Sequence, residues 1–365
     1  MRVENPPLTA EPLRVGVIGL GHAGVSHIEA FNSNPRSFLV AIAGNEPERL
    51  GALSKQYNIG SIASDWETIV ARDDLDVISI ATPNVLHHTI AIAALNSGKH
   101  VFCEKPLALN GQQSREMVEA AKSNNRILEV DFNHRRRSDI QFARSWLESE
   151  GIGRIYHSRA SWKRRAGIPG IDSWFTSKES AGGGALIDLG SHIIDSLLFM
   201  LGEPRVLAVS AVTHGELGRA GYGGMDRSSK SIEKNNFAVE DLASALLRLS
   251  DGSSIALEIT WASHAVDDED MSFELLGVEG GLRIFVSRYA QQETLSIFGD
   301  RGGIPFTLKP EVHVTGGEVS LVVEDFIEAI FSGNWSNHRG VFALHRSEIL
   351  DACYKSAALG KEVTL

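Results

Sequence analysis

Short apolar runs alternate with segments of helical length up to about residue 133, and this alternation constrains the fold most strongly. Parallel strands need crossover connections of this length, whereas antiparallel strands can be joined by tight turns. We therefore predict βαβ units with right-handed crossovers that build a doubly wound parallel sheet. The runs assigned to strands are 14–18, 38–43, 76–81, 99–103 and 127–132.

The rhythm changes after residue 134, where strand-like runs follow one another with few helices between them. Asp251-Gly252 is typical of a hairpin turn between two of these runs. Consecutive strands indicate an α+β domain with a large open, mostly antiparallel sheet. The Gly- and Ser-rich stretch 215–237 is expected to be a mobile loop. The predicted strands are 154–162, 205–213, 242–249, 254–262, 271–277 and 281–286, and helices are expected near 138–149, 185–201, 318–331 and 341–358.

The chain has 365 residues, which is more than one ordinary core needs, so we predict two domains. A short extension covers 1–12, a dinucleotide-binding domain 13–133, and a substrate-binding and oligomerisation domain 134–365. The last helix is expected to pack back on the first domain. An open sheet usually buries its uncovered face against a copy of itself, so a homodimer or homotetramer is expected.

Charge and cysteine content exclude several classes of function. The formal net charge is −11, which disfavours both nucleic acid and anionic membranes as partners. Cys103 and Cys353 are the only cysteines, so neither a disulfide framework nor a metal site is expected. Residues 1–11 lack an apolar signal sequence, and we find no apolar run of about 18 residues. The sequence thus favours a cytoplasmic protein that binds small molecules.

Gly19, Gly21 and Gly24 form a G-x-G-x-x-G turn directly after the first predicted strand. The first glycine permits the tight turn, the second lets the backbone approach a pyrophosphate, and the third lets the helix pack closely. His22 and Ala23 complete the turn at the start of the helix, where free N–H groups favour phosphate. The first domain is therefore predicted to be a Rossmann domain.

The choice between NAD and NADP depends on the end of the second strand. A carboxylate that accepts the ribose hydroxyls is usual there, but Gly44 occupies this position. Asn45 and Glu46 follow, and Arg49 lies one turn into the next helix. Arg49 would offset a 2′-phosphate, whereas Glu46 would bind the ribose. The sequence leaves the choice between NAD and NADP open, with a slight preference for NADP.

Three motifs in combination are specific enough to indicate a protein family. Glu104-Lys105-Pro106 follows the 99–103 strand, Thr82-Pro83-Asn84 and His87 follow the strand before it, and residues 182–195 read GGGALIDLGSHIID. Over nearly its whole length the chain resembles the glucose–fructose oxidoreductase and inositol dehydrogenase (Gfo/Idh/MocA) family. The resemblance implies a Rossmann domain, a second domain with a large open sheet, and hydride transfer between a nicotinamide and a hydroxyl carbon of a sugar, glycoside or cyclitol.

Lys105, Asp188 and His192 match the catalytic lysine, aspartate and histidine of that family. Their chemistry agrees with this role. A lysine at the carboxyl end of a parallel strand lies where doubly wound sheets bind ligands. Asp188 and His192 are four residues apart, which places both on one helix face, and a neighbouring aspartate orients and charges a histidine ring. The alternative is a hydrogen-bonded pair that only stabilises the helix.

The remaining candidates have a plausible structural role as well as a ligand-binding one. The predicted cofactor contacts beyond the glycine turn are Gly44, Asn45, Glu46, Arg49, Thr82, Pro83, Asn84, His87, Glu104 and Lys105. The predicted substrate contacts are Lys105, Asn133, Arg135, Trp162, Arg164, Arg165, Asp188 and His192. Asp195 is expected to be a structural partner, and Cys103 a buried strand residue.

Two other functions remain open at this point. The same fold serves for a cofactor-sensing regulator without turnover, because fold alone does not fix function. The arginine-rich strand end would also suit a reductase of an acidic, non-sugar substrate.

Overall fold

A computed structural model describes residues 11–225, 236–265, 268–288, 290–333 and 335–365. The chain divides into two compact units: Met1–Asn133 with Glu318–Ser347, and His134–Gly317 with Glu348–Leu365. Most of the expected extension 1–12, and residues 226–235 of the expected loop 215–237, lie outside the described residues.

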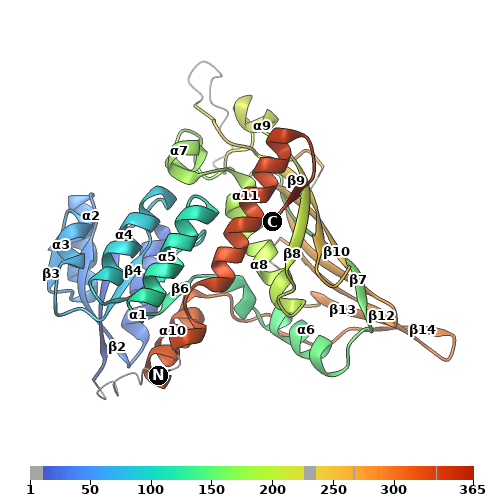
Figure 1. Ribbon diagram of the computed structural model, residues 1–365, viewed down its shortest axis with the longest axis horizontal. Helices are drawn as coiled ribbons and strands as arrows, with labels where there is room; N and C mark the ends of the chain where they lie inside the picture. The colour runs from blue at the N-terminus through green and yellow to red at the C-terminus, as the bar shows by residue number, and fades with distance from the viewer. Residues whose placement is uncertain (1–10, 226–235, 266–267, 289, 334) are drawn as a thin grey trace. The chain divides into compact units, whose positions relative to one another are not determined.

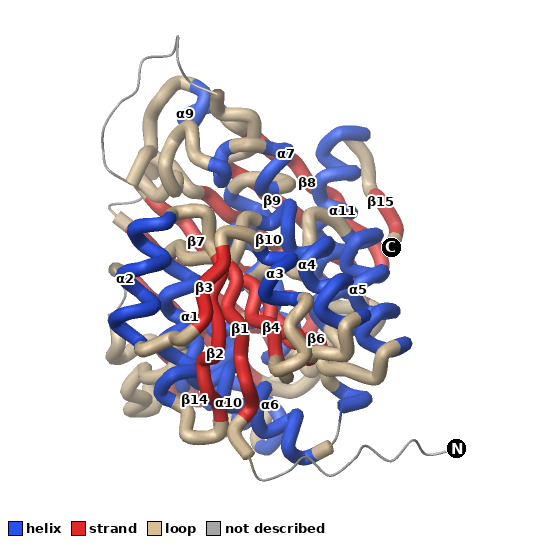
Figure 2. Tube along the Cα trace, turned by 90° about the vertical axis from the view of Figure 1, so that its left-hand side faces the viewer, coloured by secondary structure: helices blue, strands red, loops and turns tan. Residues whose placement is uncertain are grey.

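The first unit is built on a six-stranded parallel sheet in the order β3-β2-β1-β4-β5-β6 (Figure 2). This order and the all-parallel pairing confirm the predicted Rossmann topology. The short β3 was not predicted, because three residues with an exposed Ile62 give no strand signal. The strands are β1 Leu13–Ile18, β2 Ser37–Ala43, β3 Ser61–Ala63, β4 Val77–Ile80, β5 His100–Cys103 and β6 Leu128–Val130.

Helices cover both faces of this sheet. The apolar sides of α1, α2 and α10 form one core with it, and those of α3, α4 and α5 form another. Phe102 of β5 lies 5.8 Å from the Phe31 ring of α1 and 5.4 Å from the Phe326 ring of α10. The helices are α1 His22–Ser33, α2 Pro47–Tyr57, α3 Trp66–Val70, α4 Asn84–Asn96, α5 Gly111–Ser123 and α10 Val319–Ser332.

Residues 318–347 belong to the first unit, although the sequence-based bounds placed them in the second domain. The reason is packing, because the buried side of α10 completes the core that α1 begins. The last helix is α11 Val341–Leu359. Its first residues belong to the first unit, and the remainder belong to the second.

The second unit contains a nine-stranded sheet in the order β14-β13-β12-β11-β7-β10-β9-β8-β15. Only β7 and β10 pair in parallel, so the prediction of a large, mostly antiparallel sheet is confirmed. The strands are β7 Ile155–Arg164, β8 Val206–His214, β9 Leu242–Leu249, β10 Ser254–Thr260, β11 Glu269–Gly277, β12 Gly280–Ser287, β13 Leu295–Arg301, β14 Ile304–Leu308 and β15 Val363–Thr364.

Helices cover one face of this sheet. The helices α6 Ser138–Ser149 and α8 Ser191–Met200, with the second half of α11, pack on it (Figure 1). Alternate strand residues such as Leu247, Phe273 and Ile284 form the core beneath them. A short helix α9, Glu216–Arg219, lies within the stretch predicted to be a loop.

The segment Lys178–Met200 is long and apolar enough to resemble a membrane span, which our search of the sequence did not find. The structure breaks it into α7 Lys178–Ala181, a π-helical turn Leu186–Gly190 and α8. Its most apolar window is 89% buried inside the protein, as expected for the core helix of a folded domain.

Candidate active site

The glycine turn between β1 and α1 has the form that a pyrophosphate site requires. Gly19 has φ +101°, and a Cβ there would lie 2.2 Å from the carbonyl oxygen of Ala81. A Cβ at Gly24 would lie 2.0 Å from the Gly19 carbonyl oxygen, so the close packing of helix on strand needs this glycine. Gly21 is different, because a Cβ there would meet nothing within 4 Å. Its backbone, together with the exposed His22, faces open space at the helix N-terminus.

The second strand ends at Ala43, and Gly44 follows it in close contact with the Leu20 side chain. A Cβ on Gly44 would lie 2.4 Å from Leu20 Cδ1. A side chain at this position would need Leu20 to move, and the choice between NAD and NADP stays a prediction. Asn45, Glu46 and Arg49 are all exposed, and the Glu46 side chain makes no capping hydrogen bond as α2 begins.

The turn after β4 contains Thr82 and Pro83 and leads into α4 at Asn84, which is 5% exposed. His87 is fully buried, and its ring nitrogens lie 2.9 Å from the carbonyl oxygen of Pro106 and 3.0 Å from that of Thr82. Its side chain has no exposed surface, and its predicted contact with the cofactor stays a prediction. His87 ties the Thr82 turn to the Glu104–Pro106 turn.

The E-K-P turn follows β5 at the carboxyl end of the parallel sheet, and the Lys105–Pro106 peptide bond is cis. Lys105 is half-buried, and Cys103 before it is fully buried, as predicted. The Glu104 carboxylate accepts hydrogen bonds from His27 Nε2 at 3.2 Å and from the Lys105 backbone N–H at 3.1 Å. These bonds fix the Glu104 carboxylate inside the turn, and its predicted contact with the cofactor stays a prediction.

Asp188 and His192 flank the junction between the π-helical turn and α8. Such turns are frequent at functional sites, because the extra residue re-aims nearby side chains. Asp188 Oδ2 accepts a hydrogen bond of 2.9 Å from the indole N–H of Trp261, which is fully buried. Trp261 directly follows β10 and carries no motif, so its role could not be predicted. It holds the Asp188 carboxylate in place.

The His192 ring lies among other rings of the second unit. Its centroid is 4.5 Å from that of His134 and 6.1 Å from that of Trp162. Trp162 is 5% exposed, so little of its ring surface is available to stack on a sugar. We did not predict His134, although it lies between two predicted residues, Asn133 and Arg135.

Of the predicted arginines at the end of β7, Arg164 is held by a carboxylate. Glu269 Oε1 accepts from Arg164 Nε at 2.8 Å and from Trp162 Nε1 at 2.5 Å, and the Arg164 guanidinium lies 5.0 Å from the Trp162 ring centroid. Arg165 is exposed. Glu269 thus fixes the strand end that borders the rings.

Arg135 forms a two-point ion pair with Asp195, whose side chain is 1% exposed. The guanidinium also lies 5.5 Å from the centroid of the Phe199 ring. A buried carboxylate paired in this way requires its arginine. Asp195 is therefore the structural partner that we expected, and the predicted substrate contact of Arg135 stays a prediction. Asn133 is half-buried in the turn Asn133–Arg136.

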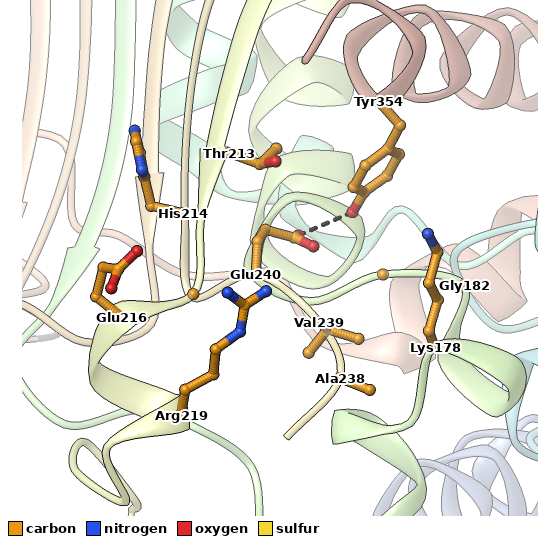
Figure 3. Close-up of a pocket in the computed structure, with 12 residues that line it drawn as sticks. Lys178, Gly182, Thr213, His214, Glu216, Arg219, Ala238, Val239, Glu240 and Tyr354 are labelled. Carbon is orange, nitrogen blue, oxygen red and sulfur yellow. Dashed lines mark hydrogen bonds between the residues drawn. The ribbon is translucent and has the colours of Figure 1, made fainter. Parts of the chain in front are cut away.

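A cavity of about 200 Å³ lies in the second unit beside the triple glycine (Figure 3). Its buried Glu240 accepts hydrogen bonds at Oε1 from the Gly184 and Leu186 N–H groups, each at 2.9 Å, and from the Tyr354 hydroxyl at 2.8 Å. Burial raises the pKa of Glu240 above its usual value, and these hydrogen bonds offset only part of that increase. Lys105, Asp188 and His192 do not line this cavity. Glu240 anchors the start of the turn that carries Asp188.

Comparisons with known proteins place the chain in a family. Residues 13–132 match the family described as "Oxidoreductase family, NAD-binding Rossmann fold", and residues 140–283 match the GFO/IDH/MocA C-terminal domain. A levoglucosan dehydrogenase from Pseudarthrobacter phenanthrenivorans is 31% identical over 95% of this chain and 96% of its own length. A D-glucoside 3-dehydrogenase from Escherichia coli is 32% identical over 98% of this chain and 99% of its own length.

A solved structure of levoglucosan dehydrogenase in complex with NADH and L-sorbose has a TM-score of 0.84 to this chain. It is 28% identical, and the match covers 97% of this chain and 99% of that one. Fold, glycine turn and relatives agree with the resemblance noted from the motifs. The chain belongs to the GFO/IDH/MocA family and is an NAD(P)-dependent oxidoreductase.

Proposed function

We propose that this chain transfers hydride between a nicotinamide and the carbon of a secondary hydroxyl on a cyclic sugar, glycoside or cyclitol. The observation that carries the proposal is the anchored Asp188 at the π-helical turn, one turn before a histidine enclosed by rings. The names of relatives support the substrate class, since they include dehydrogenases of levoglucosan, a D-glucoside and myo-inositol.

In this proposal His192 accepts the proton of the substrate hydroxyl when the alcohol is oxidised. The Asp188 carboxylate, held by Trp261, favours the charged imidazolium that results. The Lys105 ammonium donates a hydrogen bond to the reacting oxygen as it becomes a carbonyl. A bound nicotinamide supplies the hydride acceptor. The hydroxyl carbon thus loses two electrons with its hydride, and the proton stays on the protein until it leaves to solvent.

We infer that the cofactor is NAD. Gly44 packs against the Leu20 side chain, and Glu46, exposed at the start of α2, is the carboxylate that we propose accepts the ribose hydroxyls. Solved relatives hold NADH or NAD. Arg49 lies on the exposed side of α2 and is the group that would favour NADP instead.

The direct test is the absorbance of reduced cofactor when the purified protein is incubated with a panel of glycosides, anhydrosugars, inositols and hydroxy acids. We expect turnover with at least one cyclic polyol, and a higher kcat/KM with NAD than with NADP. Turnover of acidic non-sugar substrates alone would favour the alternative reductase. Tight cofactor binding without turnover on any panel member would favour the cofactor-sensing regulator.

We also propose that the chain forms a homodimer or homotetramer through the uncovered face of the nine-stranded sheet. Strand register places Val212, Leu246, Phe285 and Phe298 on this face, all at least 38% exposed. An apolar surface spread over several strands is typical of a contact between subunits.

Sedimentation should give a mass of two or four times 39.6 kDa, the mass of one chain. The double variant Leu246→Glu/Phe298→Glu should sediment as a monomer, because charge on this face opposes its burial. Val278 is 57% exposed but lies in the turn between β11 and β12, so Val278→Glu is the matched control and should keep the native mass. A monomeric native protein would contradict the proposal.

A further inference from the structure

The cavity beside the triple glycine has a buried polar floor and a charged mouth (Figure 3). Its floor contains Glu240, which is 7% exposed, with the buried Gly183 and the half-buried Tyr354. Gly183 is needed there, because a Cβ on it would overlap the Tyr354 hydroxyl oxygen. Lys178 and Arg219 line the same cavity and are exposed, so they form its mouth. All of these residues belong to the second unit.

Glu240 uses its two carboxylate oxygens differently. Oε1 accepts three hydrogen bonds, from the Gly184 and Leu186 N–H groups and from the Tyr354 hydroxyl. Oε2 accepts none from another described residue, and in Figure 3 the dashed bond leaves from one oxygen only. A carboxylate has room for about four hydrogen bonds, so Oε2 keeps its capacity to accept from a molecule in the cavity.

The group that best fits Oε2 is a hydroxyl. Burial raises the pKa of Glu240 above its usual value in spite of its three hydrogen bonds, so the floor is a poor place for charge. An ammonium there would form a buried ion pair, and the desolvation of such a pair is costly. A hydroxyl both donates and accepts, so it fits the carboxyl group in either protonation state.

The mouth has the charge to hold a single anionic group. Lys178 forms no ion pair with another described residue, and Arg219 lies three residues after Glu216 in α9, the spacing of neighbours on a helix face. With His214 counted as neutral, two cations and one carboxylate leave a net charge of +1 among the side chains at the mouth. A carboxylate matches this charge better than a dianionic phosphate, and the planar guanidinium suits its two oxygens.

The volume of the cavity limits the ligand to a small molecule. A cavity of roughly 150 Å³ holds benzene, with its six carbon atoms. By this scale the volume of about 200 Å³ encloses a molecule of about eight non-hydrogen atoms. A hexose has about twelve, so the sugar proposed as the substrate is too large to be enclosed here.

We propose that this cavity binds a small hydroxy-carboxylate of three to five carbons, with its carboxylate held by Lys178 and Arg219 and its hydroxyl on Glu240 Oε2. The three predicted catalytic residues do not line the cavity, so this is a second site. It does not rest on the proposed hydride transfer. Through Glu240 the ligand would lie against the turn that begins at Gly184 and leads to Asp188.

The test is calorimetric titration of the purified protein with 4-hydroxybutyrate, which carries a carboxylate at one end and a hydroxyl at the other. Three probes each differ from it in one group. Butyrate lacks the hydroxyl, 4-aminobutyrate has an ammonium in its place, and 1,4-butanediol has a hydroxyl in place of the carboxylate. We expect saturable binding of 4-hydroxybutyrate with a Kd of about 1 mM or tighter, and binding of every other probe at least tenfold weaker. Added salt should weaken binding, because the mouth is exposed.

Arg219→Gln and Lys178→Gln should each weaken the binding of 4-hydroxybutyrate at least fivefold, because each removes one of the two cations at the mouth. Lys355→Gln is the matched control, since Lys355 is exposed and follows Tyr354 in α11 but does not line the cavity. It should keep the native Kd. Lys105→Ala should keep it as well, which separates this site from the proposed site of hydride transfer.

Four results would overturn the proposal. The absence of saturable binding of 4-hydroxybutyrate would show that the cavity holds no such ligand. Equal binding of butyrate would show that the mouth takes an adventitious anion only, and tighter binding of 4-aminobutyrate would assign the floor to an ammonium. Loss of binding in Lys105→Ala with native binding in Arg219→Gln would place the ligand elsewhere in the protein.

Discussion

His192→Ala and Lys105→Ala should each lower kcat by about 10²- to 10⁴-fold, the range that a positioned acid or base contributes. Without the imidazole, the substrate proton loses its proposed acceptor. Without the ammonium, the reacting oxygen loses its hydrogen-bond donor. Neither side chain belongs to the glycine turn that is predicted to hold the pyrophosphate, and Lys105 is only one of many predicted cofactor contacts, so the Kd of the nicotinamide cofactor should stay within about threefold of the native value. Stopped-flow single-turnover rates and titration calorimetry measure the two quantities separately.

A purely structural role of these residues makes the opposite prediction. The variants would then lose Tm and keep a normal rate per folded molecule. Trp261→Phe is a useful companion variant, because it removes the donor to Asp188 and keeps most of the ring volume. It should reduce kcat less than His192→Ala does, since Asp188 acts through the imidazole. Full turnover in either alanine variant on the true substrate would remove that residue from the scheme.

Much of the first unit could be predicted because its signals are local. The glycine turn, the E-K-P turn and the strand–helix alternation lie in contiguous stretches of sequence, and the topology follows from known handedness rules. Spacing and family resemblance likewise led to the prediction that Lys105, Asp188 and His192 are catalytic, which the proposed variants test. Residue type alone could not show that Gly44 packs against the Leu20 side chain, because this contact joins residues that follow two different strands.

The sequence could not predict hydrogen bonds between side chains that are far apart along the chain. Trp261 reaches Asp188 across 73 residues, and Glu240 caps the Gly184 turn across 56. Arg135 seemed a substrate contact because arginine forks suit polar oxygens, yet its partner is Asp195, 60 residues away. The π-helical turn at 186–190 was also unpredictable, since its extra residue has no composition signal.

Gly21→Val should weaken cofactor binding at least tenfold, about 1.4 kcal/mol, and leave the fold largely intact. The reason is that a Cβ at Gly21 meets no protein atom within 4 Å, so an added side chain fills only the space where a pyrophosphate would approach. Its φ of −64° and ψ of −170° are open to any residue. The expected loss of stability is limited to the poorer helix cap, about 1 kcal/mol or less.

Gly24→Ala is the matched comparison, with a smaller substituent and a larger expected effect on stability. Its Cβ would overlap the Gly19 carbonyl oxygen at 2.0 Å, and backbone cannot give way as a flexible side chain does. Relief requires α1 to move off β1, so we expect a loss of about 1–3 kcal/mol in the free energy of unfolding. Denaturant titration and calorimetric titration with NAD should thus separate the variants, with Gly21→Val failing in binding and Gly24→Ala in stability. Native affinity in Gly21→Val would show that the pyrophosphate does not approach this turn.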